Sequence, residues 1–201
     1  EPYYGSYLDG SLDEFRFYDR SLSSSEVSSL FDFERTDRLA LGLKAYYPFN
    51  GNANDESNYS NDATVTGAVV TTDRFGSLNQ AYLFDGVNDY IDTPSNLKGY
   101  GIENAFTLSS WFNVKKGEES GFRNIMEDGT SYNSSSIYLG LSPSANQVYV
   151  RLDTENGSRF NDNIPVSNLK RDWNQLVYTY NGTKISLYLN GIAVYSDSIS
   201  G

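Results

Sequence analysis

The 201-residue sequence contains neither cysteine nor histidine. Without cysteine, no disulfide holds the fold, unlike in the small secreted domains that depend on such bonds. Without histidine, Ser-His-Asp catalysis, Cys-His catalysis and histidine ligation of a metal are all excluded. A metal site in this chain would therefore be built from oxygen atoms, and such sites suit calcium.

Basic residues are also scarce, with 15 Lys and Arg against 26 Asp and Glu, so the formal net charge is −11. This charge disfavours nucleic acid and anionic membranes as partners, because their phosphate groups would be repelled. No run of about 18 apolar residues occurs, so we expect no membrane insertion. No signal peptide is visible and the first residue is Glu1, so we expect a mature or excised segment of a longer protein. The 17 Tyr, 17 Gly and many Ser, Asn and Asp residues are typical of a β-rich extracellular or cell-surface protein.

Alternation of apolar and polar residues is the main pattern in the chain, and it is typical of half-buried β-strands. In QVYVRLD (147–153), three apolar residues alternate with Tyr149 and Arg151, and segments 136–142 and 184–191 follow the same pattern. Asn-Gly pairs at 181–182 and 190–191 predict hairpins with type I′ turns, because both residue types tolerate positive φ angles. We therefore expect a meander of three antiparallel strands over 174–197.

Helical patterns are rare, and the best candidate is Ser24–Phe31. Ser23 and Glu26 have the spacing of a capping box, while Leu22, Val27 and Leu30 provide a small apolar face. The charged segment 33–42 is predicted to be a linker. Loops are predicted where Gly, Asn, Ser and Asp are frequent, at 50–62, 94–104, 115–135 and 153–168.

Four further stretches carry a resemblance to a known family. They are LKAYYPFNGNANDESNYSNDATV, DRFGSLNQAYLFDGVNDYIDTP, FTLSSWFNV and DWNQLVYTYNGTKISLYLNGIAV. Together they resemble the laminin-G-like, or concanavalin A-like, jelly-roll family. The resemblance implies an all-β fold, a two-sheet antiparallel β-sandwich with one short helix, in a single domain over 1–201 whose body is 43–201.

The order of the motifs departs from that family. GSLDEFRFYDRSLSSSEVSSLF (10–31) resembles the family's C-terminal strand and helix, yet here it precedes the body. The chain is then a circular permutant with 9–31 beside 43–49, a piece of a tandem array, or a subunit that donates residues 1–32 to a neighbouring copy. Because the sandwich would have an open edge without this strand, we expect self-completion or exchange, with copies of the chain or adjacent repeats as partners.

A loop rich in Asn and Asp, NGNANDESN (50–58), is a candidate calcium site. We expect Asp55 and Asp13 to be carboxylate ligands and Asn52 and Ser57 to contribute side-chain or carbonyl oxygens. The resemblance places the two segments side by side at a rim of the sandwich. The alternative is an ordinary Asx-turn loop beside a solvated acidic strand.

Aromatic residues on the polar sides of alternating strands are candidates for glycan binding. Their rings can stack on the C–H faces of sugars, while Arg and Asn donate hydrogen bonds to hydroxyls. The alternative is a Tyr-rich surface with a buried Trp. The candidate residues are Trp111, Tyr138, Tyr149, Arg151 and Tyr188.

No pair of catalytic carboxylates is evident, because Asp13 and Glu14 are adjacent in a strand and should point to opposite faces. We therefore expect no enzymatic activity. The sequence favours a structural or adhesive unit of a surface protein, fibre or filament, in which strand exchange between copies is one option. A carbohydrate-binding module is the alternative.

Overall fold

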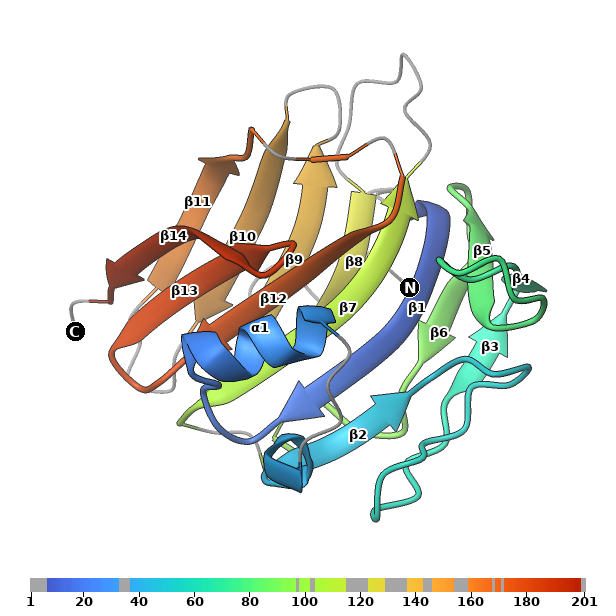
Figure 1. Cartoon of the computed structure of the whole chain (residues 1–201), viewed down its shortest axis with the longest axis horizontal. Helices are drawn as coiled ribbons and strands as arrows, with labels where there is room; N and C mark the ends of the chain where they lie inside the picture. The colour runs from blue at the N-terminus through green and yellow to red at the C-terminus, as the bar shows by residue number, and fades with distance from the viewer. Residues whose placement is uncertain are drawn as a thin grey trace.

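The computed structural model describes residues 7–32, 37–96, 98–101, 104–114, 123–128, 137–142, 146–153, 159–167, 169–170 and 172–199. Two antiparallel sheets pack face to face, and the larger one lies in front in Figure 1. The all-β sandwich with one α-helix confirms the expected fold class. None of the described helices is long and apolar enough to cross a membrane.

The larger sheet has eight strands, in the order β14-β13-β12-β7-β1-β5-β4, and β2 pairs with β1 beside β5. The described elements of this sheet are β1 (Asp9–Tyr18), β2 (Leu43–Tyr47), β4 (Val69–Thr71), β5 (Ala81–Asp85), β7 (Phe106–Val114), β12 (Asn174–Tyr180), β13 (Lys184–Leu189) and β14 (Ile192–Ser198). The last three strands form the predicted meander.

The second sheet has four strands, β8 (Arg123–Asp128), β9 (Ile137–Ser142), β10 (Gln147–Asp153) and β11 (Arg159–Pro165), in the order β11-β10-β9-β8. The two remaining described strands, β3 (Thr64–Thr66) and β6 (Tyr90–Asp92), pair with each other in a separate two-stranded sheet. Helix α1 (Ser24–Asp32) crosses the outer face of the large sheet, and a 3-10 helix, η2 (Asp37–Ala40), follows it (Figure 1).

Strand β1 lies inside the large sheet rather than at its edge. One side of it pairs with β7, and the other side pairs with β5 over its first half and with β2 over its second half. Phe15 lies opposite Tyr47, so the opening segment does lie beside residues 43–47 of its own chain. Because β1 bridges two parts of the sheet, its absence would divide the sheet, which is a larger defect than the open edge expected from the sequence.

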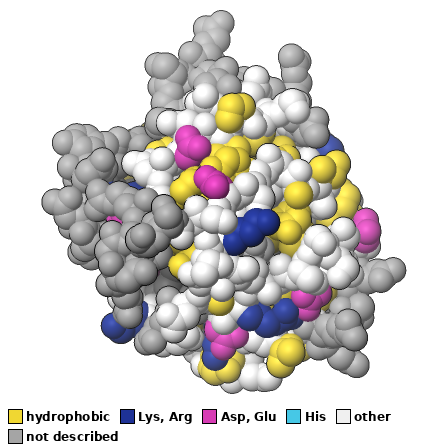
Figure 2. Space-filling view, turned by 90° about the vertical axis from the view of Figure 1, so that its left-hand side faces the viewer, with side chains coloured by type: hydrophobic (Ala, Val, Ile, Leu, Met, Phe, Trp, Pro, Cys, Tyr) yellow, Lys and Arg dark blue, Asp and Glu magenta, His cyan; other side chains and the backbone are white. Residues whose placement is uncertain are grey.

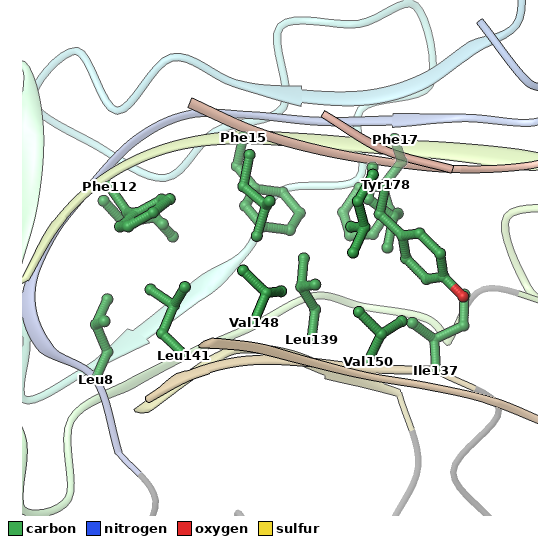
Figure 3. Close-up of a cluster of buried hydrophobic side chains, with 14 of the residues drawn as sticks. Leu8, Phe15, Phe17, Phe112, Ile137, Leu139, Leu141, Val148, Val150 and Tyr178 are labelled. Atoms are coloured by element: carbon green, nitrogen blue, oxygen red, sulfur yellow. The ribbon is translucent and has the colours of Figure 1, made fainter. Parts of the chain in front are cut away.

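Alternation along the strands builds the core between the two sheets (Figure 3). Phe15 and Phe17 of β1 point into it from the large sheet, and Leu139 of β9 and Val148 and Val150 of β10 point into it from the small one. All five are below 10% exposed. Burial of such side chains contributes about 1.5–3 kcal/mol each, so β1 is a main contributor to the core.

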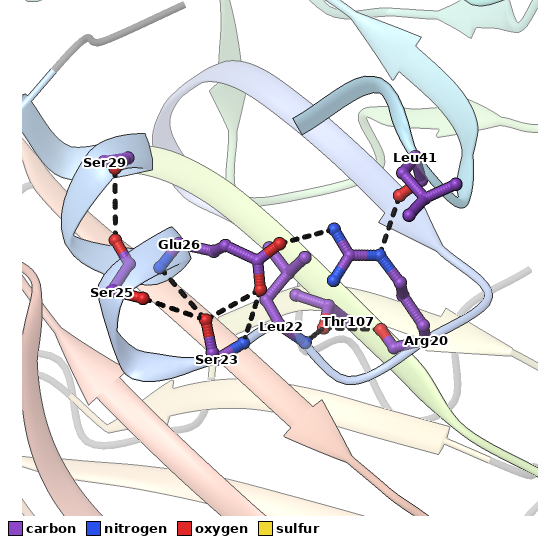
Figure 4. Close-up of polar contacts among 8 residues, drawn as sticks. All are labelled: Arg20, Leu22, Ser23, Ser25, Glu26, Ser29, Leu41 and Thr107. Carbon is purple, nitrogen blue, oxygen red and sulfur yellow. Dashed lines mark hydrogen bonds and ion pairs between the residues drawn. The ribbon is translucent and has the colours of Figure 1, made fainter. Parts of the chain in front are cut away.

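The capping box at the start of α1 is present as predicted (Figure 4). The backbone N–H of Ser23 donates to Glu26 Oε2 at 2.9 Å, and the N–H of Glu26 donates to Ser23 Oγ at 3.4 Å. Arg20 also donates to Glu26, which holds the pKa of that carboxyl at about 2. Val27 and Leu30 are buried against Val177 of β12, so the helix covers the large sheet with its apolar face.

Some local predictions were wrong. The predicted loops 115–135 and 153–168 contain β8 and β11, because polar strands at or near a sheet edge need few apolar residues. The predicted type I′ turn is present at Asn190-Gly191, where both φ angles are positive, but not at Asn181-Gly182, where only Gly182 has a positive φ. Of the predicted linker 33–42, residues 33–36 lie outside the described residues.

Candidate functional site

The outer face of the four-stranded sheet brings together three of the residues predicted to bind glycans. Tyr138 of β9 and Tyr149 of β10 form an edge-to-face pair, with ring centroids 5.1 Å apart. Arg151 lies opposite Tyr138 in the β9–β10 register, but it is only 4% exposed, and its Nη2 is 2.5 Å from Asp153 Oδ2. Both tyrosines are half-buried, so parts of their rings remain accessible.

Gly140 leaves the space in which the Tyr138 ring lies. A Cβ atom at position 140 would be 2.9 Å from Cε1 of Tyr138 and 3.2 Å from the carbonyl oxygen of Arg123. Any side chain there would therefore displace the tyrosine ring. The strand beyond β10 in this sheet is β11. Its Asn161 and Asn163 are exposed and lie opposite Arg151 and Tyr149 of β10.

The other two predicted glycan-binding residues lie on the outer face of the large sheet, far from this group in the fold. Trp111 of β7 is only 8% exposed, because Phe31 stacks on its ring at 5.5 Å and the guanidinium of Arg74 lies 4.6 Å from the ring centre. Tyr188 packs against the apolar cluster under α1. The structure therefore divides the five residues between two faces.

Asp13 is buried beside Trp111 and pairs with Arg74. Burial raises the pKa of its carboxyl to about 7, although the positive charge of Arg74 acts to lower it. Glu14 also contacts Arg74, at 4.0 Å, so the prediction that Asp13 and Glu14 point to opposite faces was wrong. The cause is a β-bulge, with Glu14 at a φ of 54°, which breaks the alternation.

Asp55 organises the loop between β2 and β3. Its carboxylate accepts hydrogen bonds from the N–H groups of Tyr46, Ser57 and Asn61 and from the hydroxyl of Ser57, all at 2.8–2.9 Å. Burial acts to raise the pKa of Asp55, but these hydrogen bonds outweigh it and lower the pKa. Asn52 likewise accepts the N–H of Asn54 through its side-chain oxygen, as in an Asx turn.

These contacts do not fit a calcium site made by the four predicted residues. Asp13 is paired with an arginine, and the oxygens of Asp55 are already occupied by donors of the protein itself. Among the described residues, no group of three or more acidic side chains is arranged to hold a metal ion. Calcium binding therefore stays a prediction from the sequence that the geometry does not support.

A cavity of about 280 Å³, which sequence analysis missed, lies between β6 and the edge strand β8. Its floor consists of aromatic residues of the core, including Phe15 and Phe17, and its walls come from 89–93 and 124–127. The stretch Asp89-Tyr90-Ile91-Asp92 lies within one of the motifs that carry the family resemblance. Nothing local in the sequence indicated that this stretch would face β8 across a gap.

The fold and this face define an antiparallel β-sandwich with an accessible polar and aromatic surface. A family model for the concanavalin A-like lectin/glucanases superfamily, of laminin G type, matches residues 85–201. The chain belongs to this superfamily. The match begins at the last residue of β5, after β1 and β2, so the permuted order of the opening segment stays a prediction.

Among solved structures, the chain is similar to the crystal structure of the binding domain of Paraclostridial Mosquitocidal Protein 1. The two are 17% identical in sequence, with a TM-score of 0.52, and the match covers 73% of this chain and 37% of that one. This similarity concerns the fold alone. No curated protein matches the chain.

Proposed function

We propose that the chain is a non-catalytic, extracellular carbohydrate-binding module, whose ligand lies along the outer face of β9, β10 and β11. The observation that supports it is the edge-to-face pair formed by the partly exposed Tyr138 and Tyr149. Two partly exposed rings offer surfaces for sugar C–H groups, and the neighbouring Asn161 and Asn163 can bond hydroxyls. Such a module would attach the protein that contains it to a polysaccharide or a glycan-bearing surface.

A glycan array probed with the 201-residue chain tests this proposal, followed by calorimetric titration of the best ligand. We expect Tyr149→Ala and Tyr138→Ala each to weaken binding at least about tenfold, the equivalent of about 1.4 kcal/mol. Gly140→Ala should also weaken it, because the new methyl group displaces the Tyr138 ring. Tyr59→Ala is the matched control, since Tyr59 is an exposed tyrosine in the loop between β2 and β3.

Unfolding curves of all four variants show whether lost binding reflects lost structure. Absence of any bound glycan on the array would overturn the proposal. So would a ligand that still binds the folded Tyr138→Ala and Tyr149→Ala variants with the affinity of the parent chain.

A structural or adhesive unit that assembles with its own copies is a second candidate, and the edges of the large sheet favour it. Val69 and Val70 of the terminal strand β4 are 57% and 40% exposed, with no charged residue in that strand to discourage pairing. At the opposite edge, seen in Figure 2, hydrophobic side chains are mixed with separate charged ones, and Ile192 is 58% exposed.

Light scattering over a concentration series distinguishes the two candidates. A compact monomer at all concentrations fits the carbohydrate-binding module. Oligomers that persist on dilution and disappear in Val70→Lys would instead support assembly through the β4 edge, because an inserted lysine blocks strand pairing.

A further inference from the structure

The polar and apolar groups around the cavity beside β8 limit the kinds of ligand that it can bind. It wraps around the free edge of that strand: Met126 lines it from the core side, and Asn124 and Glu127 line it from the outer side. Glu127 lies opposite Tyr138 in the β8–β9 register, so the cavity opens next to the proposed glycan-binding face. An oligosaccharide bound on that face could therefore place one of its sugar units in the cavity.

The polar groups on the cavity walls are mainly hydrogen-bond acceptors. Asp89 and Asp92 contribute carboxylates from one wall, and Glu127 contributes a third from the other. No lysine or arginine is among the described residues that line it. A ligand that fits these walls must supply donors, and a positive charge would be favoured over a neutral group.

Asn124 positions one of these carboxylates. Its side-chain N–H₂ donates to Glu127 Oε2 at 3.0 Å, which points the amide along the cavity wall. This hydrogen bond orients the Glu127 carboxylate on the cavity wall.

The floor and the size of the cavity favour a ring rather than a small ion. Aromatic side chains, among them Phe49, Phe84 and Tyr90, surround the space and present apolar surfaces. Aromatic faces also attract cations. A volume of about 280 Å³ is near the lower end of ligand pockets, which usually measure about 300–1,000 Å³, and suits one monosaccharide.

We propose that this cavity is a subsite for an amino sugar with a free ammonium group. The proposal rests on the carbohydrate-binding function above and narrows it to glycans that contain unacetylated amino sugars. The ammonium group lies between the carboxylates of Asp92 and Glu127, while the sugar ring contacts the aromatic floor. Acetylation would remove the charge and add bulk, so the acetylated sugar is excluded.

Calorimetric titration of the 201-residue chain with glucosamine, N-acetylglucosamine and glucose tests the subsite. We expect glucosamine to bind at least tenfold more tightly than either neutral sugar, and added salt to reduce this preference. Glu127→Gln and Asp92→Asn should each reduce the preference severalfold without unfolding the chain. Asp197→Asn, which removes the same charge from β14, is the matched control and should leave it unchanged.

The outcomes separate the subsite from the proposed function. Equal binding of the three sugars, or a preference that Glu127→Gln and Asp92→Asn leave intact, would overturn the subsite. The glycan-binding face would still stand if a neutral glycan binds and is lost in Tyr149→Ala. Conversely, a glucosamine preference that Tyr149→Ala does not change, with no glycan bound on the array, would keep the subsite and overturn the face.

Discussion

The outer face of the large sheet is covered, whereas the outer face of the four-stranded sheet carries accessible aromatic residues. On the large sheet, α1 buries its apolar side against β12, and Arg74 reaches across to Asp13 and Trp111. On the small sheet, Tyr138 and Tyr149 pair with each other and remain partly exposed. Tyr side chains therefore serve packing on one face and offer a binding surface on the other.

The difference has a structural origin in the opening segment. Residues 9–32 supply both a central strand of the large sheet and the helix that covers it. The polar side chains of β1 are consequently enclosed between the sheet and its covering elements, and they form ion pairs there. No described helix covers the small sheet, and its outward tyrosines, Tyr138 and Tyr149, stay partly exposed.

The largest expected effect concerns the core side of β1. Phe17 is 3% exposed, and its ring stacks on Tyr100 with centroids 5.5 Å apart. Phe17→Ala should lower the free energy of unfolding by about 3–5 kcal/mol, through lost burial and the cavity left behind. Urea unfolding followed by circular dichroism measures this change.

Tyr138→Ala on the small sheet is the comparison, and it should cost about 1 kcal/mol or less because the side chain lies outside the core. Similar losses in the two variants would mean that the outer face of the small sheet contributes to stability as much as β1 does. The contrast between a packing face and a binding face would then fail.

The second prediction concerns pH and Asp13. The pKa of this carboxyl is about 7 in the folded chain against 3.8 as its ordinary value, so the folded state holds the proton more tightly. Stability should therefore fall as pH rises from about 4 to about 7, by at most a few kcal/mol. Unfolding free energies measured at pH 5 and pH 7.5 give the slope.

Asp13→Asn should flatten that slope, because asparagine does not titrate. The lowered pKa of Glu26, about 2, acts in the opposite direction and only below about pH 4.5, so it does not contribute in this window. An unchanged slope in Asp13→Asn would show that another group is responsible and that Asp13 is better solvated than its burial indicates.

How far the sequence could predict the molecule differs between its regions. Many of the strands, the meander and α1 followed from alternation, Asn-Gly pairs and a capping box, all of which are local signals, whereas the two-sheet sandwich followed from the family resemblance. The environments of Asp13, Trp111 and Asp55 did not follow, because they depend on contacts between residues distant in the chain, such as Asp13 with Arg74. The cavity was missed for the same reason, since it lies between segments about 30 residues apart.

A smaller effect is expected at the cap of α1, which covers the large sheet. Ser23→Ala removes the oxygen that accepts the N–H of Glu26 and should cost about 1 kcal/mol. Ser28→Ala is the matched control: Ser28 is exposed within the helix, where alanine has the higher helix propensity, so this change should be neutral or slightly stabilising. Equal effects of the two substitutions in urea unfolding would argue against the capping box as a stabilising element.

The smallest effect is expected from removing divalent cations. Calcium bound only by the folded chain at a hundred times its Kd would stabilise it by about 2.7 kcal/mol, so a chelator would then lower the thermal midpoint visibly. We expect no such change, since Asp13 is held by Arg74 and Asp55 by backbone N–H groups. Scanning calorimetry with EDTA and with added calcium measures it, with Asp55→Asn as the second arm. A midpoint that falls with EDTA in the parent chain but not in Asp55→Asn would restore the calcium site, and it would mean that the loop between β2 and β3 rearranges to release Asp55 for the metal.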